Sequence, residues 1–163
     1  RRKVRIRWYG DLEGSVNSPV LEIKEKAGHI GWKQSFPLPS FHFPNQFSAR
    51  ELVKLMKFAD LPPKLFQDIL TLRPSLVNRY SRNYYLSRDD CYRVTLDDQL
   101  QYFRVDLLGG SFSSPFAESD EIIVELKYSQ QNDSEADYIA NNFNWRLGKN
   151  SKYVSGIFAT QSV

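Results

Sequence analysis

Cysteine and histidine are scarce in this sequence, which has one cysteine and two histidines among 163 residues. The single cysteine, Cys91, excludes an internal disulfide and fits a reducing compartment, so a cytoplasmic location is favoured. Neither His29 nor His42 stands at a spacing from Cys91 that a zinc site requires. The sequence also gives no support for a serine–histidine nucleophile, and both histidines are expected in packing or in solvated turns.

Long apolar runs and glycine-rich phosphate loops are absent as well. No stretch reaches the roughly 18–20 apolar residues of a membrane-spanning helix, and the charged first residues do not resemble a signal peptide. There is no Walker loop and no glycine-rich dinucleotide fingerprint. The chain is 41% hydrophobic, which suits one globular domain over residues 1–163. Its net charge is only +3, so its cations are expected to matter by arrangement more than by number.

That arrangement is clearest at the start of the chain, where residues 1–9 alternate between charged and apolar side chains. Successive side chains of a strand point to opposite faces, which puts four cations together: Arg1, Lys3, Arg5 and Arg7. Same-face neighbours about 7 Å apart repel by roughly 2 kcal/mol per pair at an effective dielectric near 20. A solvated outer face is the ordinary explanation. A surface that reads polyphosphate is the alternative, because anions in front of the strand would offset the repulsion.

Further segments show the period of strands or helices. Strands are predicted over 19–26, 29–36, 76–85, 91–97, 100–108 and 121–128. Helices are predicted from the Ser48 capping box to about Ala59, from Pro62 to Arg73, and from Ser134 to Gly148. Residues 11–18 and 37–46 are expected to be a turn and a connection, and the apolar segment ending at Ala159 is given no element. The pattern indicates an α+β fold with an antiparallel sheet.

Charged residues recur on several of these strands. If the strands closed a barrel with the charges inward, its lumen could not be dry, because unpaired buried charge is too costly. Such a lumen would hold water and an anionic ligand. Glu22 and Glu125 would repel phosphate unless each pairs with a lysine or holds a divalent metal, and Mg²⁺ or Mn²⁺ suits one or two carboxylates with substrate phosphates. For Glu125, a simple ion pair with Lys127 and metal binding both stay open.

Six short motifs appear in order along nearly the whole chain. They lie at residues 3–9, 21–24, 80–82, 93–97, 125–128 and 151–153. Together they resemble the polyphosphate polymerase domain of the vacuolar transporter chaperone (VTC) family, which belongs to the triphosphate tunnel metalloenzymes and is related to CYTH proteins. The resemblance implies an antiparallel β tunnel barrel with a few covering helices, whose N-terminal strands are missing from this sequence.

The resemblance also implies an enzyme, a phosphotransferase that moves the γ-phosphate of ATP onto a polyphosphate chain with Mn²⁺ or Mg²⁺. Glu125 is then expected to hold the metal, Glu22 to serve as an ion-pair partner, and Lys149 and Lys152 to close one end of the tunnel. The catalytic residues are expected to be Arg5, Arg7, Lys24, Arg82 and Arg93. Phosphate binding is expected from Lys3, Arg5, Arg7, Lys24, Arg82, Arg93, Lys127, Lys149 and Lys152.

Three alternatives stay open on the sequence alone. The same tunnel could hydrolyse triphosphate or make a cyclic nucleotide. The domain could instead be a non-catalytic accessory or sensor that binds polyphosphate. Nucleic-acid binding is the least favoured, because inward carboxylates argue against it. The basic strands and five aromatic residues could nevertheless form a platform on which bases stack: Trp8, Tyr9, Tyr80, Tyr84 and Tyr85. The expected partners are therefore ATP and polyphosphate, with no membrane segment in this chain.

Overall fold

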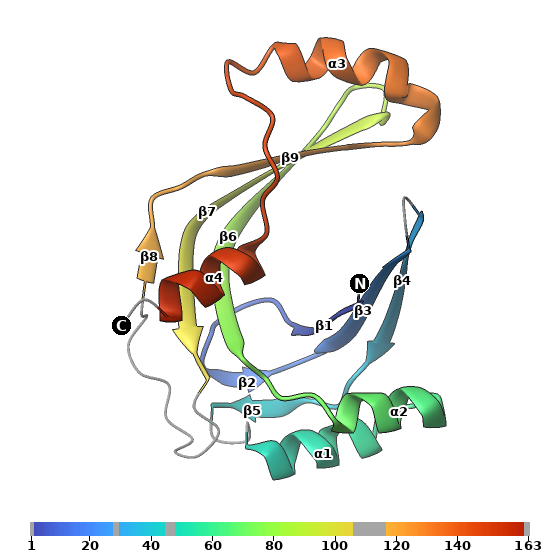
Figure 1. The fold of residues 1–163 in the computed structure, drawn as a ribbon, viewed down its shortest axis with the longest axis vertical. Coiled ribbons are helices and arrows are strands. Elements are labelled where there is room, and N and C mark those ends of the chain that lie inside the picture. The colour runs from blue at the N-terminus through green and yellow to red at the C-terminus, as the bar shows by residue number, and fades with distance from the viewer. Residues whose placement is uncertain (1, 28–29, 45–47, 106–116, 162–163) are drawn as a thin grey trace. The chain divides into compact units, whose positions relative to one another are not determined.

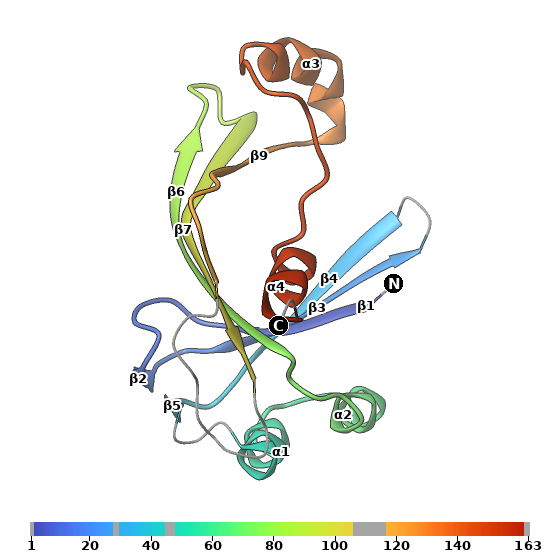
Figure 2. The ribbon, with the colours of Figure 1, turned by 60° about the vertical axis from the view of Figure 1, so that its left-hand side comes forward.

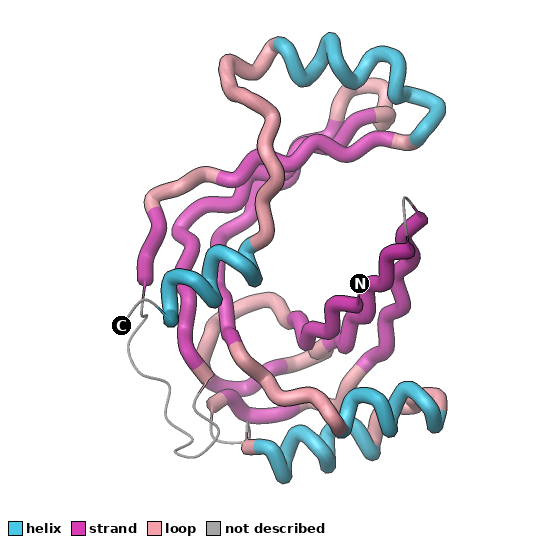
Figure 3. The backbone as a smooth tube through the Cα atoms, in the orientation of Figure 1, coloured by secondary structure: helices cyan, strands magenta, loops and turns pink. Residues whose placement is uncertain are grey.

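The computed structural model describes residues 2–27, 30–44, 48–105 and 117–161. The described chain contains nine strands, four α-helices and one 3₁₀-helix (Figure 3). It divides into two compact units. Unit 1 comprises residues 1–74 with 105–112, and unit 2 comprises residues 75–104 with 113–163.

Unit 1 is built on a three-stranded antiparallel sheet of order β1-β3-β4 (Figure 1). Its strands are β1 (Arg2–Arg7), β3 (Val20–Ala27) and β4 (Ile30–Pro37). These confirm the strands predicted over 1–9, 19–26 and 29–36. A separate ribbon pairs β2 (Gly14–Val16) with β5 (Phe41–Phe43). These two short strands lie in segments expected to be a turn and a connection, so that expectation is wrong for them.

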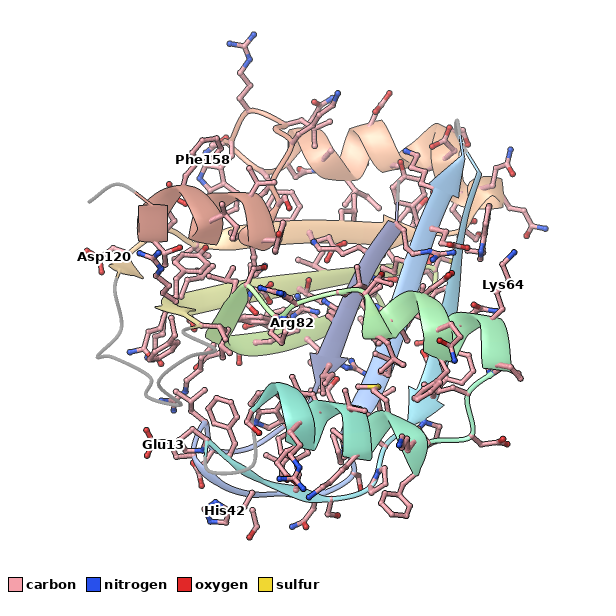
Figure 4. The ribbon with its side chains drawn as sticks, turned by 60° about the horizontal axis from the view of Figure 1, so that its bottom comes forward. Glu13, His42, Lys64, Arg82, Asp120 and Phe158 are labelled. Carbon is pink, nitrogen blue, oxygen red and sulfur yellow. The ribbon has the colours of Figure 1, made fainter. Side chains whose placement is uncertain are left out.

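One face of the β1-β3-β4 sheet is apolar. Leu21 and Ile23 of β3 are almost fully buried. The helices α1 (Ala49–Lys57) and α2 (Pro63–Leu70) lie side by side next to the sheet (Figures 1 and 4), and Arg2 on its apolar face donates to Asp68 of α2 at 2.8 Å. The capping box predicted at Ser48 is confirmed, since its side chain accepts from the Glu51 amide. The opposite face of the sheet is thereby left for the charged side chains.

Unit 2 is built on a long antiparallel hairpin (Figure 2) of β6 (Leu76–Leu86) and β7 (Tyr92–Arg104). Along the other edge of β7, β8 (Ala117–Ser119) pairs near its end and β9 (Ile123–Tyr128) pairs near its start. The predicted strands over 76–85 and 121–128 are confirmed. Those over 91–97 and 100–108 form one strand, β7, although residues 106–108 lie outside the described chain. A bulge with Gln99 at a φ of 51° lets β7 continue between them.

The helices of unit 2 differ more from the sequence prediction. The helix α3 (Asp133–Asn141) follows the 3₁₀-helix η1 (Gln130–Asn132) and ends well before the predicted end at Gly148. At the observed end of α3, the Asn142 side chain donates to the Tyr138 carbonyl. The closing apolar segment, given no element, forms α4 (Lys152–Gln161), which lies across β6 and β7 (Figure 1). A Cβ atom on Gly156 would stand 2.5 Å from Leu76 Cδ2 and 2.6 Å from Tyr102 Cδ1. Only glycine permits this close approach of helix to sheet.

The α+β class with antiparallel sheets is confirmed. The strands within the described ranges form three separate sheets, and none of these sheets closes into a barrel, so the tunnel barrel stays a prediction. Among the helices that the structure describes, none is long and apolar enough to cross a membrane.

Candidate functional site

Each unit carries a face on which cations gather around a buried carboxylate. In unit 1 this face is the side of the β1-β3-β4 sheet that lies opposite the helices. Residues directly across an antiparallel pair share a face, and the register therefore sets the neighbours. One row crosses the sheet as Lys3, Lys24 and Lys33, and the next as Arg5, Glu22 and Ser35. Together with Arg7 at the following position on β1, we call these residues the cationic face of unit 1.

Glu22 organises the cationic face of unit 1. Its side chain is fully buried, and Arg5 Nε donates to its Oε2 at 2.6 Å. Lys33 Nζ lies 2.5 Å from Oε1, and Arg7 reaches the same oxygen at 3.3 Å. Burial alone would raise the pKa of Glu22, but hydrogen bonds from Lys33 and Arg5 and the charges of Arg5 and Arg7 outweigh it and lower the pKa to about 2. The carboxylate therefore stays ionised and holds three cations together.

Arg7 contacts both Glu22 and Tyr9, and one of its N–H donors makes no hydrogen bond with a described residue. Its Nη1 donates to the Tyr9 hydroxyl at 2.7 Å, and its guanidinium lies over the Tyr9 ring. The buried Nε–H of Arg7 has no hydrogen-bond partner in the described part of the chain. A buried donor without an acceptor is costly, so this N–H is a place where an incoming oxygen would be favoured.

The cationic face of unit 2 lies on one side of the β6-β7-β9 strands. The register places Arg82 beside Asp97, Tyr84 beside Thr95 and Glu125, and Leu86 beside Arg93 and Lys127. Lys152, the first residue of α4, reaches this face from outside the sheet. The cationic face of unit 2 is defined by seven residues: Arg82, Arg93, Thr95, Asp97, Glu125, Lys127 and Lys152. In Figure 4, Arg82 lies over the strands of this hairpin.

Asp97 plays in unit 2 the part that Glu22 plays in unit 1. Its side chain is 1% exposed and pairs with Arg82 through both nitrogens of a fork and with Lys152 Nζ. Burial by itself would raise the pKa of Asp97, but the hydrogen bonds from Arg82 and Lys152 outweigh it and the pKa is lowered. Tyr80 adds a further hold, because both Arg82 and Lys152 lie against its ring. Asp97 thus ties α4 to the sheet at the cationic face.

The remaining predicted residues of unit 2 are less enclosed. Arg93 and Lys127 stand directly across β7 and β9, and both line a pocket of about 250 Å³ with Leu86, Asp90, Cys91 and Tyr128. Glu125 is about half exposed and pairs with Lys127 at 3.1 Å. An ion pair with Lys127 is one of the two alternatives that the sequence left open for Glu125, the other being metal binding. Lys149 is exposed in the segment between α3 and α4 and is not held on the cationic face by any contact with a described residue.

The described residues contain no group of three histidine, cysteine, aspartate or glutamate side chains that could hold a metal ion. His29 lies outside the described chain, as does Arg1. Glu125 nevertheless fits a different kind of site. Mg²⁺ is often bound by one or two carboxylates together with substrate phosphates, and Glu125 is accessible on the face that bears the cations.

Sequence reasoning placed Lys3, Arg5, Arg7 and Lys24 together, and the structure does bring them to one face. It also anticipated Glu22 as an ion-pair partner, which the contacts to Arg5, Arg7 and Lys33 confirm. It missed Lys33, Asp97 and Thr95 as members of the two faces. The alternation of β7 already predicts that Thr95 and Asp97 share a face with Arg93. Their partners depend on the strand register and on the helix α4, which the sequence analysis did not predict.

The comparisons with known proteins agree with the motifs. A family model described as VTC domain matches residues 1–160. No curated protein and no solved structure matches the chain.

Proposed function

The chain belongs to the VTC domain family, and from this premise we propose that it is a phosphotransferase of the polyphosphate polymerase kind. In this proposal the γ-phosphoryl group of ATP is transferred to the end of an inorganic polyphosphate chain. The observation that carries the proposal is the clustering of cations in excess around one buried carboxylate on a face of each unit. Each such face carries more positive than negative side chains and so has positive charge to offer a polyanion.

The row Lys3, Lys24 and Lys33 supports a polyanionic ligand in particular. Like charges directly opposite one another across a sheet destabilise it, and here the register sets three lysines side by side. Lys33 already has Glu22 as a counter-charge, and phosphate oxygens in front of the row would add further negative charge beside the three lysines. The row beside it contributes Arg5, and Arg7 follows with an N–H that lacks an acceptor among the described residues. A chain of phosphates can contact several rows at once, whereas a single small anion cannot.

The reaction needs little from the protein beyond position and charge. A terminal oxygen of the polyphosphate attacks the γ-phosphorus of ATP, the bond to the β-phosphate oxygen breaks, and ADP leaves with that oxygen. In each unit, the arginines and lysines of the cationic face would offer positive charge to phosphate oxygens: Lys3, Arg5, Arg7 and Lys24 in unit 1, and Arg82, Arg93, Lys127 and Lys152 in unit 2. Lys149 belongs to the proposal only as an exposed cation near α4.

Glu125 is the residue proposed to hold Mg²⁺ or Mn²⁺, which when bound would supply positive charge that stabilises the phosphates. To do so the carboxylate would exchange its contact with Lys127, a change that its half-exposed position permits. We expect Glu125→Gln to abolish metal-dependent turnover and to leave polyphosphate binding within about twofold of wild type. Full turnover in this variant would contradict the metal role of Glu125.

The experiment that tests the proposal is incubation of the full-length protein with ATP, Mn²⁺ and a polyphosphate primer, with separation of long polyphosphate from free phosphate. Long polyphosphate with ADP supports the proposal. Free phosphate alone indicates hydrolysis, and tight binding without turnover indicates an accessory or sensor domain. The matched pair of variants is Arg82→Ala and Arg79→Ala. Both arginines are on β6, but Arg79 is exposed on the face opposite Arg82, so only Arg82→Ala should weaken polyphosphate binding.

A further inference from the structure

Thr95 lies at the centre of the cationic face of unit 2, and its hydroxyl has no use within the fold. The residue is 1% exposed. Its Oγ1 is buried and makes no hydrogen bond with any described residue. Buried hydroxyls are normally paired, and leaving one unpaired costs stability. A threonine kept in such a place therefore points to a partner that the folded chain does not itself provide.

The neighbours of Thr95 show what kind of partner fits. On β7, Arg93 and Asp97 stand two residues to either side of it on the same face, about 7 Å away. Tyr84 on β6 and Glu125 on β9 stand directly across from it. Arg82 and Lys127 occupy the diagonal positions on the two neighbouring strands. Three cationic residues thus occupy positions next to Thr95 in the strand register.

The two carboxylates near Thr95 are already engaged. Asp97 pairs with Arg82 and Lys152, and Glu125 pairs with Lys127. Arg93, in contrast, has no ion pair with any residue in the described segments. The local excess of charge is positive, so a bare cation would be repelled from the hydroxyl. An anion with oxygen acceptors would be attracted and could accept its hydrogen bond.

The two residues directly across from Thr95 on the neighbouring strands, Tyr84 and Glu125, are partly exposed. Tyr84 is 54% exposed, and the side chain of Glu125 is 47% exposed. Both therefore stand on the solvent-exposed part of the face rather than in the core. An anion that displaces Glu125 from Lys127 would gain Lys127 as a partner.

We propose that the Thr95 hydroxyl donates a hydrogen bond to a phosphoryl oxygen of a phosphate chain bound between Arg82 and Arg93. This inference rests on the proposed function and deepens it, because it assigns a neutral donor to a site otherwise made of charges. The donor is directional, whereas the lysines and arginines around it act mainly through charge. Thr95 would therefore fix where one phosphoryl group sits on the face.

The test uses inorganic tripolyphosphate as the probe, the full-length protein, and no divalent metal. Thr95→Val keeps the shape and removes the hydroxyl, and Thr95→Ser keeps the hydroxyl as the matched control. Without ligand, we expect the Tm of Thr95→Val to equal or exceed that of wild type, because no internal hydrogen bond is lost. By titration calorimetry, its Kd for tripolyphosphate should rise about tenfold, and that of Thr95→Ser should stay within about twofold.

Each other outcome has a definite meaning. Wild-type affinity in Thr95→Val overturns the inference and leaves the proposed function standing, provided that wild type binds tripolyphosphate. A lower Tm of the ligand-free valine variant also overturns it, since the hydroxyl would then have an internal partner. If the loss of affinity appears only after Mg²⁺ is added, the hydroxyl serves the metal and the phosphate assignment is wrong. Failure of wild type itself to bind tripolyphosphate refutes the proposed function instead.

Discussion

In unit 1 the middle of the cationic face is occupied by a buried carboxylate, Glu22, whereas in unit 2 the corresponding middle is a buried hydroxyl, Thr95. In unit 2 the buried carboxylate, Asp97, lies one row away from that centre. Glu22 occupies the centre of its face as a counter-charge, and Arg5, Arg7 and Lys33 pair with it. Thr95 instead leaves a hydroxyl at the centre of its face that makes no hydrogen bond with any described residue. Two faces of similar composition can thus differ in how much of their surface a ligand can use.

The two carboxylates also take their cations from different places. Arg5, Arg7 and Lys33 all come from strands of the sheet that contains Glu22, so strand register alone assembles that cluster. Asp97 takes Arg82 from the neighbouring strand and Lys152 from α4. The cluster in unit 2 therefore depends on the docking of a helix far along the chain. Stability and site geometry are coupled more tightly in unit 2 than in unit 1.

Asp97→Asn tests this difference between the units and should cause the largest loss in the free energy of unfolding. Arg82 and Lys152 are only 23% and 16% exposed, so both would be left mostly buried with no carboxylate. Removal of one partner of a buried pair costs several kcal/mol, and we expect about 3 kcal/mol here. Urea unfolding at neutral pH measures the cost, and hydrogen exchange should show increased opening of α4. A protected α4 in this variant would contradict the coupling of helix and face.

Glu22→Gln should cost less at neutral pH, about 1–2 kcal/mol. Its partners Arg5, Arg7 and Lys33 are 40%, 34% and 44% exposed, so water can solvate the cations that it leaves unpaired. Asp97→Asn is therefore expected to be the more damaging of the two neutralisations. An equal or larger loss in Glu22→Gln would mean that exposure of the cations does not control the cost.

The same variant carries a pH signature with a fixed sign. The pKa of Glu22 is lowered from 4.5 to about 2, so its ionic stabilisation is complete above pH 4.5 and is lost as the pH falls toward 2. The difference in unfolding free energy between wild type and Glu22→Gln should shrink across this range. Other carboxylates, Asp97 among them, titrate in both proteins and cancel. A constant difference from pH 4.5 to pH 2 would contradict the lowered pKa.

The strands of both faces could be predicted from the sequence because alternation is a local property. Arg5 and Arg7 share a face in any strand that contains both, and the same holds for Arg93, Thr95 and Asp97. The pairing of Arg5 and Arg7 with Glu22 could also be predicted, since β1 and β3 are close in sequence and their charges are complementary. What alternation does not supply is the identity of a distant partner. Lys33 and Lys152 therefore became visible as members of the two clusters only with the register and with α4.

The errors have physical causes of the same kind. The strands β2 and β5 are three residues each, too short for a period to be recognised. The helix α4 contains Val154, Gly156 and Ile157, which are weak helix formers, so packing on the sheet overrides its local propensity. The predicted end of α3 at Gly148 failed because residues 141–144 include three asparagines, whose side chains compete for backbone hydrogen bonds.

Gly156→Ala tests this override directly and should have the smallest effect of the three neutral-pH changes. The added Cβ would stand 2.5 Å from Leu76 Cδ2 and 2.6 Å from Tyr102 Cδ1. Leu76 can turn aside, but Tyr102 is 4% exposed and its ring is confined, so α4 itself must shift. Overpacking costs about 1–3 kcal/mol and the better helix propensity of alanine returns up to about 1 kcal/mol, which leaves a net loss of about 1 kcal/mol.

The matched control is Gly148→Ala, where an added Cβ would meet nothing within 4 Å and the backbone needs no left-handed conformation. It should be neutral in urea unfolding. Because Lys152 is one turn away from Gly156 on α4, displacement of the helix should also pull its ammonium from Asp97 and weaken tripolyphosphate binding. If Gly156→Ala lowers stability but leaves that affinity unchanged, the docking of α4 supports the fold of unit 2 without positioning Lys152 for the ligand.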